Sequence, residues 1–134
     1  MYTWSRYTAG QGSGGVRTNA AVSPLVAFQA RGAHVTFEPA ASAAAAAKAA
    51  AEADVAIVFG SAHSSEGHDR SNLLFATPTA QAAATTEEVI AAVSKVQKKT
   101  VVVAAVPGQI LTDWRADVAA ILVPFLPGEI ANSK

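Results

Sequence analysis

The apolar residues of this chain fall into short continuous runs, separated by stretches with helical spacing. Three runs read as buried strands, at residues 55–59, 100–105 and 118–123. Residues 33–38 alternate apolar and polar side chains, which also predicts a strand, ended by Pro39. Strands that alternate with helices indicate a parallel sheet covered on both faces. The pattern therefore predicts an α/β fold, a three-layer sandwich with a mostly parallel sheet and helices on both faces.

Two helix start signals lie in the first half of the chain. Ser23 followed by Pro24 predicts an N-cap and a first helical turn, and Gly32 lies just past the expected end of that helix. Ser42 can cap a second helix, an alanine-rich segment that extends to about residue 53. Both helices are expected to alternate with the strands and to lie against the sheet.

A third start signal is a capping box, in which Thr85 pairs with Glu88. The helix that follows is expected to end at Lys98-Lys99, where cations suit the helix dipole. Its predicted core-facing side chains are Val89, Ile90, Val93 and Val96. Residues 110–114 are expected to form one helical turn, with the Trp114 indole packed in the core rather than stacked on a sugar.

Composition narrows the class of protein. The 134 residues are 51% hydrophobic and 15% charged, which favours one folded domain with a real core. Basic and acidic side chains balance, and no basic stripe occurs, so nucleic acid and anionic membrane are poor candidate partners. The sequence contains no run of about 18 apolar residues, so it predicts no membrane-spanning helix. The N-terminus lacks the layout of a signal peptide, and the compartment stays open.

Metal and disulfide chemistry find little support in the sequence. Cysteine is absent, which excludes disulfides and cysteine-based zinc sites. His34, His63 and His68 share no metal-ligand spacing. His34 is expected to be a structural histidine within the strand at 33–38. We therefore expect neither a metal site nor a cofactor.

The segment with the most chemical character is SSEGHDR at residues 64–70, directly after the run at 55–59. Ligands of open α/β sheets gather outside the carboxyl ends of the strands. Glu66 is a candidate proton donor there, and Gly67 beside it would let the backbone approach a ligand without a Cβ clash. The alternative reading is a solvated polar loop. A loop of this length in a compact domain is usually functional or mobile.

Six segments, taken in order, resemble one family. They are GQGSGGV at 10–16, SPL at 23–25, ADVAIV at 53–58, SEGHDR at 65–70, TVVV at 100–103 and FLPGE at 125–129. In this order they resemble the second, α/β-sandwich domain of glycoside hydrolase family 3, the β-glucosidase-like enzymes. The resemblance covers roughly residues 8–131. It implies a retaining β-glycosidase in which a separate barrel domain supplies an Asp nucleophile.

The resemblance also assigns roles to residues. Glu66 matches the general acid/base, which must hold a proton near neutral pH and so needs a raised pKa. The glycine turn at Gly12, Ser13 and Gly14 is expected to line the sugar cleft, because this segment lacks the strand and spacing of a phosphate loop. Gly67, His68, Asp69 and Arg70 are the other expected substrate-binding residues, with His68 at the rim.

Asp69 and Arg70 have two interpretations. They could shape the loop through an ion pair or backbone hydrogen bonds, or they could contact sugar hydroxyls and orient Glu66. The expected partners are a β-linked glucoside or oligosaccharide and the barrel domain. The domain at 1–134 is expected to be incomplete at both ends, inactive alone and able to self-associate through exposed sheet edges.

Two other functions remain open at this point. One is a non-catalytic carbohydrate-binding or interaction module with the same sandwich fold. The other is a flavodoxin-like nucleotide-binding domain, which shares the fold class but would need the phosphate motif that this chain lacks. Fold class alone does not choose among these functions, so the loop at 64–70 carries the choice.

Overall fold

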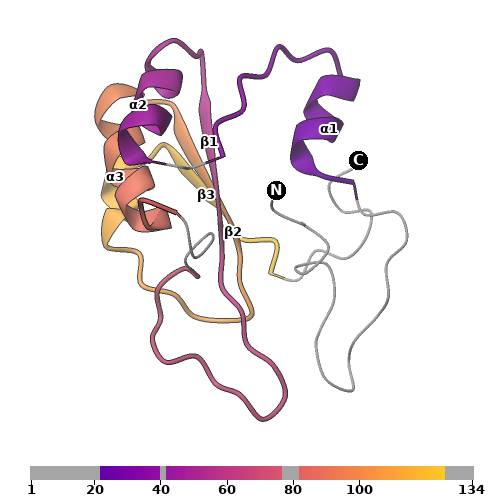
Figure 1. Ribbon diagram of the computed structural model, residues 1–134, viewed down its shortest axis with the longest axis vertical. Coiled ribbons are helices and arrows are strands. Elements are labelled where there is room, and N and C mark those ends of the chain that lie inside the picture. The colour runs from indigo at the N-terminus through magenta and orange to yellow at the C-terminus, as the bar shows by residue number, and fades with distance from the viewer. Residues whose placement is uncertain (1–21, 40–41, 77–81, 126–134) are drawn as a thin grey trace.

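A computed structural model describes residues 22–39, 42–76 and 82–125. Its centre is a parallel sheet of three strands in the order β1-β2-β3 (Figure 1). The strands are β1 (Ala56–Ser61), β2 (Thr100–Ala105) and β3 (Ala120–Leu122). The α/β class and the parallel sheet predicted from the apolar runs are therefore confirmed. All three strands end at the same edge of the sheet, which is where the candidate loop begins.

In the described parts of the chain, four helical segments accompany the sheet. They are α1 (Pro24–Ala30), α2 (Ala43–Ala51), α3 (Thr86–Val96) and a 3₁₀ segment, η3 (Asp113–Asp117). α2 and α3 pack together on one side of the sheet, and α1 lies on the other side (Figure 1). Within the described ranges, no helix is long and apolar enough to cross a membrane.

The predicted N-caps are confirmed. The Ser23 hydroxyl accepts from the Val26 amide at 3.3 Å, and the Ser42 hydroxyl accepts from the Ala45 amide at 3.1 Å. Each bond satisfies an amide that the first helical turn leaves without a partner. Gly32 follows α1 with φ of +79°, the left-handed conformation that glycine adopts at little cost.

The capping box of α3 is also confirmed. The Thr85 hydroxyl accepts from the Glu88 amide at 3.2 Å, and the Glu88 carboxylate accepts from the Thr85 amide at 2.8 Å. Of the predicted core-facing residues, Val89, Ile90 and Val93 are buried. The prediction was wrong for Val96, which is 49% exposed because it is the last residue of α3, where the chain turns away towards β2.

The strand predicted at 33–38 is absent from the sheet. These residues form no ladder with the described strands, and most are exposed, Phe37 at 63%. Alternation of apolar and polar residues is a necessary property of a half-buried strand, but the strand also needs a hydrogen-bonded neighbour. His34 is accordingly an exposed residue outside the sheet rather than a histidine within a strand.

Other boundaries also moved, among them the end of α3, which lies at Val96 with Gln97 as the C-cap rather than at Lys98-Lys99. β1 continues to Ser61 because its ladder with β2 extends through the pair Ser61–Ala105. β3 is shorter than the apolar run at 118–123 because only Val101 to Val103 of β2 pair with it. The turn expected at 110–114 forms later, at η3, and Trp114 lies within it, 7% exposed as a core residue.

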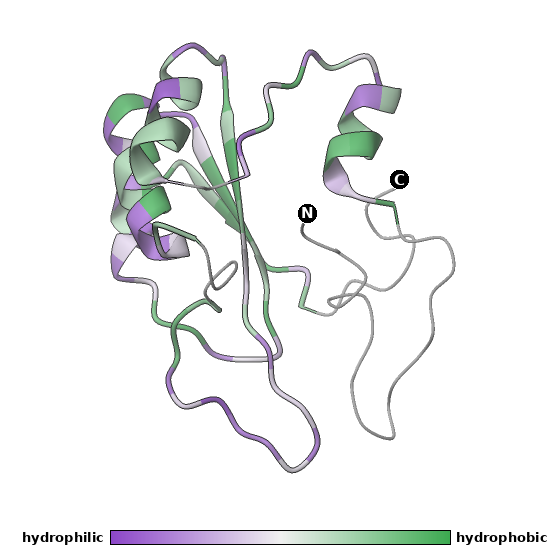
Figure 2. Cartoon of the chain, viewed as in Figure 1, coloured by the Kyte–Doolittle hydropathy of each residue, from purple (hydrophilic) through white to green (hydrophobic). Residues whose placement is uncertain are grey.

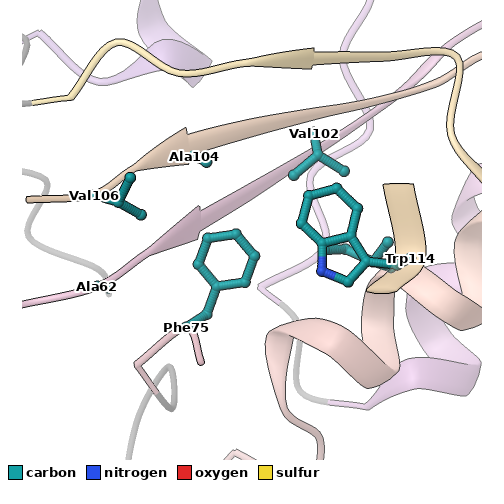
Figure 3. Packing of buried hydrophobic residues seen from close by; sticks show 7 residues of the cluster. Ala62, Phe75, Val102, Ala104, Val106 and Trp114 are labelled. Atoms are coloured by element: carbon teal, nitrogen blue, oxygen red, sulfur yellow. The ribbon is translucent and has the colours of Figure 1, made fainter. Parts of the chain in front are cut away.

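The sheet has two unlike faces. Alternate residues point to opposite faces, so Val58 and Val102 face α2 and α3, whereas Ile57 and Phe59 face the other side. The core lies on the first face and combines α3, β2 and η3 with Phe75 (Figure 3). On the second face several apolar side chains are partly exposed, among them Ile57, Phe59 and Leu122.

Candidate functional site

The candidate site is the loop that leaves β1 at the carboxyl edge of the sheet. Its two ends are held together, because the Ala76 amide donates to the Ser61 carbonyl at 2.7 Å. The first loop residue is tied to the neighbouring strand, where the Ala62 amide donates to the Ala105 carbonyl at 3.1 Å. Residues 62–75 therefore form a closed surface loop with adjacent ends. Figure 2 shows that its outer part is mostly hydrophilic, in contrast to the strands.

The tip of this loop is a tight turn that presents Glu66. The Ser65 amide donates to the His68 carbonyl at 3.3 Å, and the His68 amide donates to the Ser65 carbonyl at 3.1 Å. Gly67 has φ of +74° at the third residue of the turn, where type II turns take glycine. Glu66 occupies the second position and is exposed. The turn therefore places the candidate residue on the exposed surface of the loop.

The backbone explains the glycine at position 67. A Cβ atom added there would meet no heavy atom within 4 Å, so nothing in the described chain crowds this position. Its φ of +74° is strained for residues with a side chain. Gly67 is therefore required by the turn itself. The expected close approach of a sugar to this residue stays a prediction.

The return half of the loop is fixed at two points. The Leu111 amide donates to the Leu73 carbonyl at 2.9 Å, which joins the loop to the segment after β2. The Phe75 amide donates to the Glu87 carboxylate at 2.8 Å, in the first turn of α3. The Phe75 ring stacks on the Trp114 indole with centroids 6.0 Å apart and planes at 23° (Figure 3). This packing confirms the core role predicted for Trp114.

Arg70 connects the outer part of the loop to the neighbouring strand end. Its Nη2 donates to the Gln109 carbonyl at 2.7 Å. Its Nη1 is buried and has no hydrogen-bond partner among the described residues. Of the interpretations open for Asp69 and Arg70, backbone hydrogen bonding is the one found for Arg70. Asp69 is exposed beside it.

The loop brings together five of the predicted site residues: Glu66, Gly67, His68, Asp69 and Arg70. Gly12, Ser13 and Gly14 lie outside the described residues. Gln109 was missed by sequence reasoning. Its position four residues after the end of β2 was the available signal, because loops after neighbouring parallel strands meet at one edge.

Metal binding finds no site in the part of the chain that the structure describes. There, no group of three or more His, Cys, Asp or Glu side chains lies close enough to hold an ion. His63 and His68 are both exposed. The loop itself presents carboxyl and imidazole groups, with Glu66 in the turn.

Comparisons with known proteins agree on one family. The model of the glycosyl hydrolase family 3 C-terminal domain matches residues 4–133. Among solved structures, the β-glucosidase D2-BGL from Chaetomella raphigera is 31% identical, with a TM-score of 0.76, over 92% of this chain and 18% of that one. The β-glucosidase from Bifidobacterium adolescentis is 28% identical, with a TM-score of 0.73, over 97% of this chain and 20% of that one.

A third relative, the β-D-glucoside glucohydrolase from Trichoderma reesei, is 28% identical with a TM-score of 0.76, over 92% of this chain and 18% of that one. The chain therefore spans about a fifth or less of the length of these enzymes. No curated protein matches the chain. The family model covers nearly every residue, and the parallel sheet with its edge loop agrees with the resemblance seen in the sequence. The chain thus belongs to the family of glycosyl hydrolase family 3 C-terminal domains.

Proposed function

We propose that this domain supplies the general acid/base of a retaining β-glycosidase, and that Glu66 is the residue that transfers the proton. The supporting observation is the presentation of Glu66 on an exposed turn at the carboxyl edge of a parallel sheet. Open α/β sheets bind ligands at this edge. The substrate class is a β-linked glucoside, by likeness to the solved β-glucosidases.

The chemistry requires a second carboxylate from elsewhere. In the first step, a nucleophilic Asp of the barrel domain attacks the anomeric carbon while Glu66 donates its proton to the departing glycosidic oxygen. In the second step, water attacks the same carbon, the bond to the Asp breaks, and the Glu66 carboxylate takes the proton of that water. The two carboxyl groups of such enzymes lie about 5–5.5 Å apart. The domain alone is therefore inactive.

Because Glu66 is exposed in this domain, the barrel domain must provide the surroundings that raise its pKa. A general acid needs a raised pKa, which comes from apolar surroundings or from a nearby negative charge. Glu66 stands at the outer end of its loop, so the docked barrel domain provides both, through its surface and its nucleophile. Bound substrate would likewise cover the Glu66 carboxyl group. Assembly of the two domains is then a condition for catalysis as well as for binding.

The test is reconstitution with a family 3 barrel domain. The chain is co-produced with that domain, and the turnover of an aryl β-glucoside is compared with that of either part alone. Glu66→Gln should lower kcat by about 10²- to 10⁴-fold, the contribution typical of general acid–base catalysis. The control is Glu52→Gln, because Glu52 is exposed at the C-cap of α2 and precedes β1. Its kcat should equal that of the wild type.

Two further outcomes decide the assignment. Azide should restore turnover to Glu66→Ala on a substrate with a good leaving group, because the small anion replaces the water that needs a base. Unchanged kcat in Glu66→Gln, or no turnover beyond that of the barrel domain alone, would refute the proposal. Calorimetric binding of cellobiose that is strong and independent of Glu66 would instead favour the non-catalytic carbohydrate-binding module.

A further inference from the structure

Arg70 holds the base of the turn that carries Glu66. It follows the turn-closing residue His68 by two positions, and its Nη2 donates to the Gln109 carbonyl at 2.7 Å. The two partners are 39 residues apart in sequence and lie after neighbouring strands. A single side chain therefore joins the loop after β1 to the segment after β2, four residues from Glu66.

The other anchors described for the loop hold its two ends and its return half, and one of them, the bond from the Phe75 amide to the Glu87 carboxylate, uses a side chain from outside the loop. The bond between Ser61 and Ala76 closes its neck, and the bond between Leu73 and Leu111 fixes its return half. Each involves backbone groups, which keep their hydrogen bonds when side chains change. The Arg70 bond is different because it depends on the identity of one side chain in the outer half of the loop.

The chemistry of arginine suits this task. A guanidinium stays charged at all working pH values and offers donors in a fixed plane, so it can orient what it joins. Here Nη2 makes the short bond to Gln109, while Nη1 is enclosed by the protein. The guanidinium is thus set into the protein between the two segments, and a short neutral side chain such as that of Gln would not reproduce the bond.

We propose that Arg70 is a positioning residue for Glu66, and that its effect on the reaction passes through that carboxylate. This inference rests on the proposed function. A catalytic group displaced by about 1 Å can lose on the order of 100-fold in rate. Loss of the Arg70–Gln109 bond leaves the neck closed but lets the turn move relative to the sheet edge.

The test is a double-mutant cycle in the reconstituted enzyme. Arg70→Gln should lower kcat by roughly 10- to 100-fold with little change in KM, since the displaced group acts in the transition state. In the Glu66→Gln background the same substitution should change kcat by less than about 2-fold, because coupled residues are not additive. Arg70→Lys should recover part of the loss. Arg115→Gln, an exposed arginine of η3, is the matched control.

The alternative role for Arg70 is a direct contact with a sugar hydroxyl. In that case Arg70→Gln would raise KM, and its effect would multiply with that of Glu66→Gln, which would overturn the inference while leaving the proposed function intact. Full activity of Glu66→Gln would refute both the positioning role of Arg70 and the proposed function. The four kinetic measurements therefore separate failure of the inference from failure of the function on which it rests.

A second readout needs no catalysis. The His68 amide donates to the Ser65 carbonyl at 3.1 Å, and this bond closes the turn. Hydrogen exchange of that amide in the full chain should accelerate in Arg70→Gln, while the Ala76 amide at the neck should be unaffected. Unchanged exchange at His68 would contradict the positioning role, and equal acceleration at both amides would indicate loss of the whole loop instead.

Discussion

Gly60 lies directly against the ring of Phe75. A Cβ atom added at position 60 would be 2.7 Å from Cε1 of that ring, closer than real Cβ contacts allow. Gly60 belongs to β1, and Phe75 is the residue that returns the loop to the core. The absence of a side chain on the strand thus makes room for the ring that seats the loop.

Gly60→Ala should destabilise the domain by about 1–3 kcal/mol, because a methyl group inserted into a packed core displaces its neighbours. Unfolding in urea measures the change in free energy. Gly108→Ala is the control, because a Cβ at position 108 would meet no heavy atom within 4 Å. Equal stability of the two variants would show that the Phe75 ring can shift to another position without a cost in stability.

Thr85→Ala should cost about 1 kcal/mol of stability, the usual value of a lost N-cap. The substitution removes the hydroxyl that accepts from the Glu88 amide and leaves that amide without its partner. Thr112→Ala is a matched comparison, since Thr112 precedes η3 and makes no capping bond with its side chain. Thermal unfolding should separate the two variants clearly. If both lost the same amount, the hydroxyl of Thr85 would have no capping value.

Glu87→Ala should destabilise the return of the loop, because it removes the carboxylate that accepts from the Phe75 amide at 2.8 Å. Hydrogen bonds to charged groups contribute about 1.5–3 kcal/mol. Glu87→Gln keeps an acceptor oxygen and should lose less. In urea unfolding, the free energy of unfolding should fall in the order wild type, Glu87→Gln, Glu87→Ala. A Gln variant less stable than the Ala variant would contradict it.

We propose that the domain self-associates through the exposed edges of its sheet, of which β3 is one among the described strands. Leu122 is 57% exposed there, and Ile57 and Phe59 of β1 are also partly exposed. Apolar patches of this kind favour association. Sedimentation velocity of the isolated chain should show species larger than a monomer as concentration rises, and Leu122→Ser should reduce them. Leu111→Ser, outside the sheet, is the control. A monomer at every concentration would refute the proposal.

Local signals in the sequence predicted most of the helices and strands. The caps at Ser23, Ser42 and Thr85 depend on residues within three positions of one another, so a short stretch of sequence contains the whole interaction. The apolar runs marked β1 and β2 for a similar reason, since a continuous run of apolar residues is itself a local signal of a strand. The loop after β1 was likewise visible from its polar residues, but the tight turn at Gly67 was not predicted.

Features that depend on distant partners could not be read in the same way. The alternating residues 33–38 match a strand pattern, but the pattern does not say whether an edge is available for pairing. The contact between Arg70 and Gln109 involves a backbone carbonyl, which leaves no trace in residue identity. Phe75 and Trp114 were separate apolar residues in the sequence, and only the fold brings their rings together.

The closure between Ser61 and Ala76 has an evolutionary consequence. Because it joins main-chain atoms, the closure itself does not depend on the side chains at positions 63–69, although the turn within this stretch requires Gly67. Insertions and replacements there that keep Glu66 and Gly67 would change the exposed surface of the loop while sparing the scaffold. Related domains should therefore tolerate differences in the length and composition of this stretch on either side of the turn that carries Glu66 and Gly67.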